Sequence, residues 1–210
     1  MMRIESLADK PDRAGRYLVR LDNGSSMRLY RQTVEDYGLF PGKELSTEEF
    51  ALLRNDAGQM SAKMRAVRIV SASSVSKDDL RMRLIRKGED PRQAEEAVEW
   101  MSDLNLVDDR QTAEQIVSRC IARGCGLAKA KQMLYEKRIP KQYWQEALED
   151  YPDMTEKILE FLRSRLAPDS DQRAIKRATD ALLRRGHSYA QIRGAMRLLD
   201  FEDFPEENYG

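Results

Sequence analysis

The residues of this chain whose types and spacing could do chemistry are basic, and they gather around two predicted turns. Residues 119–141 hold seven basic residues and one acid, and residues 157–197 hold ten and four, so each stretch carries a charge of +6. Guanidinium and ammonium groups at this density attract anions, either a phosphate backbone or an acidic protein surface. An ordinary solvated surface fits the same runs, so both interpretations stay open. The predicted partner- or DNA-binding residues are Arg119, Arg123, Lys129, Lys131, Lys137, Arg138, Lys141, Arg184, Arg185, Arg193 and Arg197.

The remaining charge is distributed in the opposite sense. The whole chain has 36 basic and 36 acidic residues and therefore no net charge. Residues 89–114 include nine acidic and two basic residues, and residues 202–207 are acidic as well. The separation of the two signs indicates a chain whose own field orients it on a partner, with its first repeat negative and the later ones positive.

Enzymatic chemistry finds little support in the sequence. It has no glycine-rich phosphate loop, no nucleophile elbow and no zinc-binding histidine pair. The single histidine, His187, is predicted to be a turn residue that partly packs, and Asp108 and Asp109 are predicted to cap a helix. Cys120 and Cys125 are interpreted as reduced thiols, because a zinc site needs four ligands. We therefore expect no catalytic residue, no metal and no cofactor.

Three copies of a helix-turn-helix pattern must position the basic side chains. Leu84, Leu134 and Leu182 each lie near the end of an amphipathic helix, and they stand 50 and 48 residues apart. After each turn, apolar residues recur at the i, i+3, i+4 and i+7 positions of one helix face. A period of this length is typical of a helical repeat array. The recurring residues are Ala94, Ala97, Val98 and Met101, then Trp144, Ala147, Leu148 and Tyr151, then Ile192, Ala195, Met196 and Leu199.

The predicted fold is mainly α: three tandem three-helix, helix-turn-helix-like repeats in an elongated array, preceded by a small N-terminal module with a β-hairpin. Each repeat has few large apolar residues, so neighbouring repeats are expected to stack and complete each other's burial. The predicted ranges are 1–57 for the α+β module with its hairpin at about 16–30, 58–106 for repeat one, 107–152 for repeat two, 153–203 for repeat three and 204–210 for an acidic tail.

Local structure is predicted from turn and cap residues. Asn23 followed by Gly24 predicts the hairpin turn, whereas residues 1–13 are expected to be frayed or an edge strand. Residues 56–58 are expected to interrupt the helix that starts after Ser46. The predicted helix caps are Ser46, Ser76, Asp90 and Ser188. The apolar stripe predicted for the helix after residue 58 is Met60, Met64, Val67 and Val70.

The turn of repeat two differs in composition from the other two. Arg138 stands where repeats one and three have Gly88 and Gly186. Glycine adopts a left-handed helix cap without steric cost, whereas arginine there costs on the order of 1 kcal/mol. Two expectations stay open: repeat two turns differently, or Pro140 ends the helix and no left-handed residue is needed.

Four runs of residues carry a resemblance to a known family. They are Val-Asp-Asp-Arg-Gln-Thr-Ala at 107–113, Arg-Gly-Cys-Gly at 123–126, Lys-Arg-Ile-Pro at 137–140, and Leu-Leu-Arg-Arg-Gly-His-Ser at 182–188 with Ile192 after it. Together these runs resemble the RecX family of recombination regulators, over roughly residues 58–201, and the N-terminal module is similar to the extension of longer members. Two positions depart from the family pattern: His187 replaces an aromatic residue and Arg138 a frequent glycine.

The resemblance implies tandem three-helix repeats and a regulator without catalysis of its own. Proteins of this family bind the RecA recombinase, typically along the groove of its filament on single-stranded DNA, and inhibit its ATPase and strand exchange or limit filament growth. It therefore implies a modulator of recombination, DNA repair and the SOS response, in contact with RecA and with single- or double-stranded DNA. We expect a cytoplasmic protein, since no apolar run approaches the ~18 residues of a membrane span and the N-terminus shows no signal pattern. We also expect a monomer.

The alternative function is direct DNA binding by a helix-turn-helix-type repressor or architectural factor. Three-helix units with basic turns are also typical of DNA readers. The third helices lack the one-sided clusters of Asn, Gln and Arg that base recognition favours, so the sequence indicates sequence-specific binding only weakly.

Overall fold

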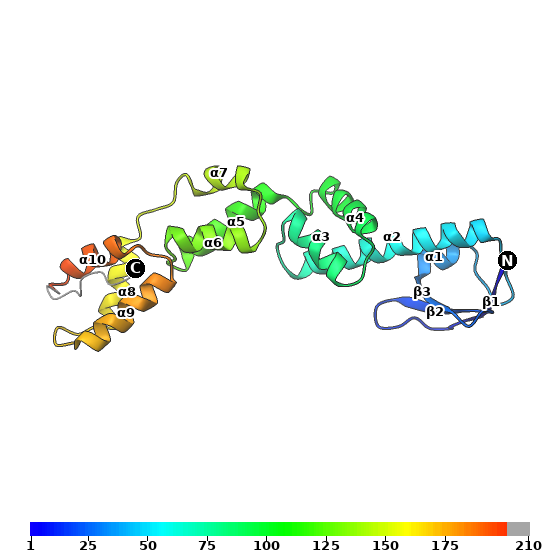
Figure 1. The fold of residues 1–210 in the computed structure, drawn as a ribbon, viewed down its shortest axis with the longest axis horizontal. Helices are drawn as coiled ribbons and strands as arrows, with labels where there is room; N and C mark the ends of the chain where they lie inside the picture. Colours follow the sequence, from blue (N-terminus) through cyan, green and yellow to red (C-terminus); the bar gives the residue numbers. More distant parts are fainter. Residues whose placement is uncertain (201–210) are drawn as a thin grey trace. The chain divides into compact units, whose positions relative to one another are not determined.

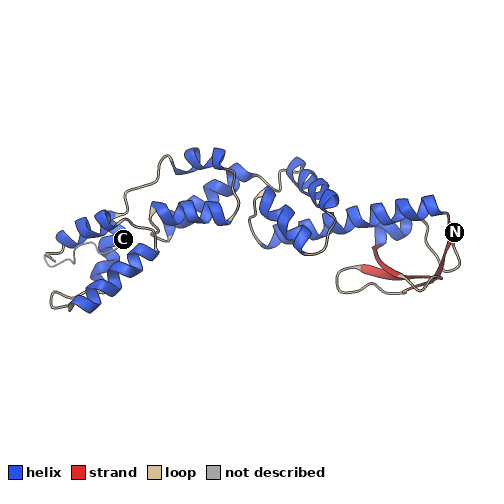
Figure 2. Cartoon of the chain, viewed as in Figure 1, coloured by secondary structure: helices blue, strands red, loops and turns tan. Residues whose placement is uncertain are grey.

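The computed structural model describes residues 1–200, which are mainly helical with a small antiparallel sheet at the N-terminal end (Figure 2). The chain divides into two compact units, the first Met1–Asp108 and the second beginning at Asp109; their elements are labelled in Figure 1. The acidic stretch at 202–207 and the predicted tail at 204–210 lie outside the described residues. Within residues 1–200, no helix combines the length and the apolar content that a membrane crossing requires.

Four strands form the sheet in the order β3-β2-β1-β4, and every pairing is antiparallel. The predicted hairpin is confirmed. Its turn contains Gly24 at a φ of 78°, a left-handed conformation that suits glycine, and the Leu21 N–H donates to the Ser25 carbonyl over 2.9 Å. The strands are β1 (Met2–Leu7), β2 (Arg16–Leu21), β3 (Ser26–Tyr30) and β4 (Glu44–Leu45).

The first residues of the chain form an inner strand. The expectation of a frayed or edge segment is therefore wrong for β1, which pairs with β2 on one side and β4 on the other. Ile4 is only 1% exposed, and its carbonyl accepts a hydrogen bond from the Gly42 N–H at 2.8 Å. The pairing shifts register between Ile4 and Ser6, so the alternation of apolar and polar residues is too short to indicate a strand.

α2 (Thr47–Ala72) is one continuous helix of 26 residues, so the predicted interruption at residues 56–58 is wrong. The predicted capping box at Ser46 is present. Gly58 lies inside the helix, where an added Cβ would come within 2.3 Å of the Gln93 side chain. The end of the Gln93 side chain from α4 fills the space beside Gly58, and the glycine does not end its own helix.

The two halves of α2 contribute to different cores. Leu53 packs in the core under the sheet, whereas Ala62, Ala66 and Ile69 pack in the core of repeat one. The predicted stripe is wrong for Met64, which is 37% exposed, because small alanines let α2 and α4 approach closely. Besides α2, the helices of this unit are α1 (Arg31–Asp36), α3 (Lys77–Arg86) and α4 (Pro91–Asp103).

The second unit contains two separate apolar cores, one for α5–α7 and one for α8–α10. Each repeat in this unit thus buries its own core, and the expectation that neighbours complete each other's burial is not met here. The last helix of repeat two is short, and its Trp144 is half-buried, with the indole N–H donating to the Ile139 carbonyl at 2.9 Å. The elements are α5 (Asp109–Ala122), α6 (Leu127–Glu136), the 3-10 helix η1 (Lys141–Tyr143), α7 (Trp144–Leu148), α8 (Thr155–Arg163), α9 (Gln172–Arg184) and α10 (Tyr189–Arg197).

The central turn of each repeat adopts the same left-handed conformation. Gly88 has a φ of 88°, Arg138 of 56° and Gly186 of 85°. The expectation that repeat two turns differently is therefore wrong, and so is the alternative in which Pro140 makes a left-handed residue unnecessary. Arg138 accepts the local strain because the Ile139 N–H donates to the Leu134 carbonyl at 3.0 Å, which closes the helix end.

Candidate partner-binding surface

The turn after α5 packs directly on the turn after α9, and we call this contact the turn joint. It consists of residues 124–126 against residues 185–187. The Gly126 N–H donates to the Arg185 carbonyl at 2.8 Å, and the Ala128 N–H donates to the Gly186 carbonyl at 3.3 Å. Two turns from different repeats are thus joined through their backbones.

Glycine is required at two positions of the turn joint because the backbones approach so closely. A Cβ added to Gly126 would lie 2.0 Å from the Gly186 carbonyl oxygen. A Cβ added to Gly186 would lie 2.2 Å from the Lys129 backbone nitrogen, in addition to the strain of its positive φ. The Gly-Cys-Gly and Arg-Gly-His runs therefore have a packing role.

His187 lies within the turn joint and is more buried than the sequence predicts, with 4% of its surface exposed. Its Nε2 lies 3.0 Å from the Gly124 carbonyl oxygen, which can only accept, so Nε2 carries the proton. Nδ1 is buried and has no hydrogen-bond partner among the described residues. Burial lowers the pKa of the imidazole; the bond to Gly124 opposes this shift, and the charge of Arg185 adds to it. The ring is a neutral packing group.

The turn joint brings four of the predicted basic residues into one region. Arg123 and Lys129 flank the turn after α5, and Arg184 and Arg185 lie at the turn after α9. Lys129 is half-buried and the three arginines are exposed. Residues far apart in the sequence thus form one cationic region.

The other predicted residues lie elsewhere. Lys137, Arg138 and Lys141 follow the C-terminal end of α6, whose ten residues separate them from the turn joint by roughly 15 Å. The structure therefore divides the predicted group around repeat two. The remaining candidates are exposed residues on three helices: Arg119 on α5, Lys131 on α6, and Arg193 and Arg197 on α10.

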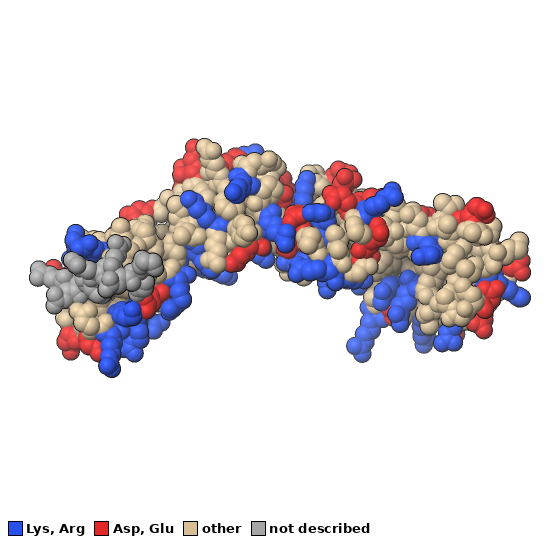
Figure 3. All heavy atoms as spheres, in the orientation of Figure 1, with Lys and Arg blue, Asp and Glu red and all other residues tan. Residues whose placement is uncertain are grey.

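Beside the turn joint, four arginines line a cleft of about 560 Å³, which we call the α9 cleft. None of them forms an ion pair with a carboxylate of the described residues. The guanidinium carbons of Arg185 and Arg165 lie 4.5 and 5.6 Å from the centre of the Phe161 ring, which holds both groups by cation–π attraction. Lys and Arg side chains gather over the region of α9 in Figure 3. The lining residues are Phe161, Arg165, Ala174, Arg177, Ala178, Ala181, Arg184 and Arg185.

Sequence reasoning missed Arg165 and Arg177. Both lie away from the repeated turns, Arg177 within α9 and Arg165 just after the end of α8. Arg177 stands seven residues before Arg184, which places both on one face of α9, so helical spacing could have found it. No sequence signal indicates Arg165, because its place depends on how α8 packs on α9.

The titratable thiol and phenol groups near the turn joint are partly buried. Cys120 is buried on α5, and burial raises the pKa of its thiol; Cys125 lies in the turn, and the two cysteines form no disulfide. Tyr151 donates to the Cys125 carbonyl at 2.7 Å, and burial raises its pKa to about 12. Within residues 1–200 no three His, Cys, Asp or Glu side chains are grouped as a metal ion would require.

Comparison with known proteins gives the family of this chain. No family model matches it. A protein of Syntrophotalea carbinolica named "Regulatory protein RecX" is 32% identical over 145 residues, which cover 68% of this chain and 93% of that protein. The chain belongs to the RecX family.

Longer alignments extend the relationship to the N-terminal module. RecX proteins of Clostridioides difficile and Clostridium acetobutylicum are 24% and 26% identical and cover 96% and 98% of this chain, and 97% of their own length in both cases. Two solved RecX structures share the fold. One has a TM-score of 0.58 at 20% identity, covering 92% of this chain and all of the other. The second, from Lactobacillus salivarius, has a TM-score of 0.57 at 23% identity, covering 68% and 97%.

Proposed function

We propose that this RecX-family chain regulates the RecA recombinase. It binds the RecA filament on single-stranded DNA and inhibits ATP hydrolysis and strand exchange, so that it modulates recombination, DNA repair and the SOS response. It acts in the cytoplasm as a monomer and without catalysis of its own. Membership of the RecX family, whose relatives are named regulatory proteins, carries this proposal.

The α9 cleft and the adjacent turn joint are the proposed docking surface. Arginines without a carboxylate partner gain most from an external anion, because no internal ion pair has to be broken. Arg177 and Arg184 meet this condition, and Arg185 is oriented by Phe161. A filament on DNA presents phosphates and acidic side chains, so the interaction is strong at low salt and screened at high salt.

The test is the ATPase activity of RecA on single-stranded DNA with this protein titrated in. We expect saturable inhibition at or below a one-to-one ratio. The double variant Arg177→Glu/Arg184→Glu should need at least about tenfold more protein for half-inhibition, a loss of about 1.4 kcal/mol. The matched control is Arg163→Glu/Arg173→Glu, which changes the same charge on α8 and α9 at exposed residues outside the cleft.

Two results would contradict the proposal at different levels. Absence of inhibition by the natural protein, in either order of addition, would remove the regulatory function. Equal inhibition by the cleft variant and its control, both folded by circular dichroism, would leave the function and move the docking surface away from the α9 cleft.

Direct DNA binding is the second candidate, favoured by the same arginine-lined cleft. A protein that binds single-stranded DNA through about six phosphates loses affinity with salt at a log–log slope of roughly −4. If such binding occurs without RecA and distinguishes between DNA sequences, the reading of DNA by a helix-turn-helix replaces the filament proposal.

A further inference from the structure

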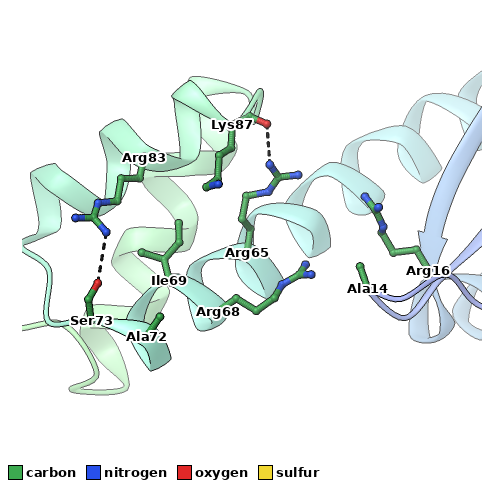
Figure 4. Close-up of a pocket in the computed structure, with 9 residues that line it drawn as sticks. All are labelled: Ala14, Arg16, Arg65, Arg68, Ile69, Ala72, Ser73, Arg83 and Lys87. Carbon is green, nitrogen blue, oxygen red and sulfur yellow. Dashed lines mark hydrogen bonds between the residues drawn. The ribbon is translucent and has the colours of Figure 1, made fainter.

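A second group of cations lies in the first unit, before the acidic stretch at 89–114. The expectation that repeat one is negative is therefore wrong, because residues 58–88 include eight basic and two acidic residues. Five cationic side chains line a cleft of about 440 Å³ formed by α2, α3 and the start of β2, and we call it the α2 cleft (Figure 4). No acidic residue is among those that line it. The five are Arg16, Arg65, Arg68, Arg83 and Lys87.

Three of these arginines are oriented by carboxylates that lie outside the lining of the cleft. Ion pairs hold their side chains in place and reduce the conformational entropy that a ligand would have to remove. The pairs are Arg16 with Asp12 at 2.9 Å, Arg65 with Glu89 at 2.7 Å and Arg83 with Asp79 at 2.8 Å.

Arg68 and Lys87 form no ion pair with a carboxylate of the described residues, so the cleft keeps an excess of two positive charges. Arg68 donates to the Tyr30 hydroxyl and, over 3.1 Å, to the Met64 carbonyl. In Figure 4 its side chain extends from α2 toward the wall that carries Arg16. Arg68 and Lys87 are both exposed and therefore available to an external anion.

The end of α3 would by itself repel an anion, because the last carbonyls of a helix carry partial negative charge. Arg65 removes part of this obstacle by donating to the Lys87 carbonyl at 2.7 Å. The cleft is thus positive even where a helix ends in it.

We propose that the α2 cleft binds the phosphate backbone of single-stranded nucleic acid. The lining runs along α2 from Arg65 to Ala72, roughly 10 Å at 1.5 Å per residue. This length exceeds the size of one phosphate group, so the cleft can contact successive phosphates of one strand. One guanidinium group can bind two oxygens of a phosphate at once, and four of the five cations are arginines.

The N-terminal module has a defined part in this site. It supplies Arg16 as one wall, and the Tyr30 hydroxyl holds Arg68 in its direction. The module and repeat one therefore form the site together. This site is separate from the α9 cleft and does not depend on an interaction with RecA.

The experiment measures binding of a fluorescein-labelled oligo-dT to the full chain by fluorescence anisotropy over a series of salt concentrations, without RecA. The variant Arg68→Gln/Lys87→Gln removes the two cations that have no carboxylate partner. Since each phosphate contact contributes ~0.7 to the slope of log affinity against log salt, the slope should become shallower by about 1.4. Affinity at about 0.1 M salt should fall about 25-fold.

The matched control is Arg54→Gln/Arg92→Gln, which removes the same charge from exposed residues of the first unit outside the cleft. It should keep the natural slope. Lys87→Gln alone, whose side chain makes no hydrogen bond among the described residues, avoids any effect on folding through Tyr30. It should lower affinity about fivefold and the slope by about 0.7.

Three outcomes would overturn the inference. The first is no binding of oligo-dT by the natural protein at low salt. The second is an equal slope for both cleft variants and the control. The third uses the Arg177→Gln/Arg184→Gln protein, in which the α2 cleft is unchanged. If poly-glutamate at equal charge displaces oligo-dT from this protein, the cleft binds an acidic peptide instead. Loss of RecA inhibition has no bearing on any of the three.

Discussion

The two units of this chain connect their parts in opposite ways. In the first, α2 runs without interruption from the core under the sheet, where Leu53 packs, to the core of repeat one, where Ala66 packs. In the second, residues 149–154 between the two repeats contain no helix or strand, and the turn joint connects the repeats through space.

The difference shows which sequence changes each connection tolerates. A shared helix depends on many side chains, and each contributes a part of the burial. The turn joint depends on close approach of two backbones, so it fails if Gly126 or Gly186 gains a side chain. One connection is distributed over a long element, and the other is concentrated at two residues.

The substitution with the largest expected effect tests whether the turn joint depends on its two glycines. Gly126→Ala would place a Cβ 2.0 Å from the Gly186 carbonyl oxygen, and both groups belong to backbones that cannot shift without breaking their hydrogen bonds. We expect a loss of about 3 kcal/mol or more in the free energy of unfolding. Urea unfolding followed by far-ultraviolet circular dichroism measures it.

Its control is Gly194→Ala, inside α10, where no atom lies within 4 Å of the added Cβ. Alanine is the better helix former, so this change should stabilise by up to about 1 kcal/mol. A Gly126→Ala protein as stable as the natural one would show that the backbones are not in contact.

Two substitutions with a smaller expected effect compare equivalent turns of the two units. Gly186→Ala and Gly88→Ala both force alanine into a left-handed conformation, at φ of 85° and 88°, which costs on the order of 1 kcal/mol in each. Only at Gly186 does the Cβ also overlap the Lys129 backbone; at Gly88 nothing lies within 4 Å. Gly186→Ala should therefore cost roughly 1–3 kcal/mol more.

Hydrogen exchange locates this extra loss. The Gly126 amide, which donates to the Arg185 carbonyl, should exchange faster in Gly186→Ala and at the natural rate in Gly88→Ala. If the Gly126 amide exchanges equally fast in both variants, the left-handed conformation alone, and not the contact between repeats, explains why residue 186 is glycine.

The smallest effect concerns pH. The pKa of His187 is lowered in the folded chain by burial, below its ordinary value of about 6.5, so the unfolded chain binds a proton first as pH falls. The stabilisation is therefore complete above about pH 7 and is lost as pH falls through 6.5 toward the folded-state pKa. The free energy of unfolding of the natural protein should decrease in this window relative to His187→Phe. A pH-independent difference between the two would contradict a neutral buried ring.

Much of the helical architecture could be predicted from local signals. Ser46, Ser76, Asp90 and Ser188 all cap the helices assigned to them, because a side chain that accepts from the first free amides acts within three residues. The apolar face after the turn is buried in repeat one as predicted. In repeat three it is buried except for Leu199, which is half-buried and follows the end of α10.

The failures share a physical cause, which is dependence on distant residues. Gly58 suggests an interruption until Gln93 is seen to occupy the space beside it. β1 has one well-buried apolar residue, Ile4, and becomes a strand only through pairing on both sides. The cations of the α2 cleft come from α2, the end of α3 and the start of β2, so only the packing of these elements brings them together.

The turn joint also bears on how relatives of this chain can diverge. Its hydrogen bonds run between backbone groups, so they specify glycine at two positions and leave the charge of the flanking side chains unrestricted. Arg123, Arg184 and Arg185 can therefore be exchanged for other residues without altering how the repeats meet. The residues that fix the contact between the repeats are therefore different from those that would contact a partner, so the binding surface can change by single substitutions while the fold stays the same.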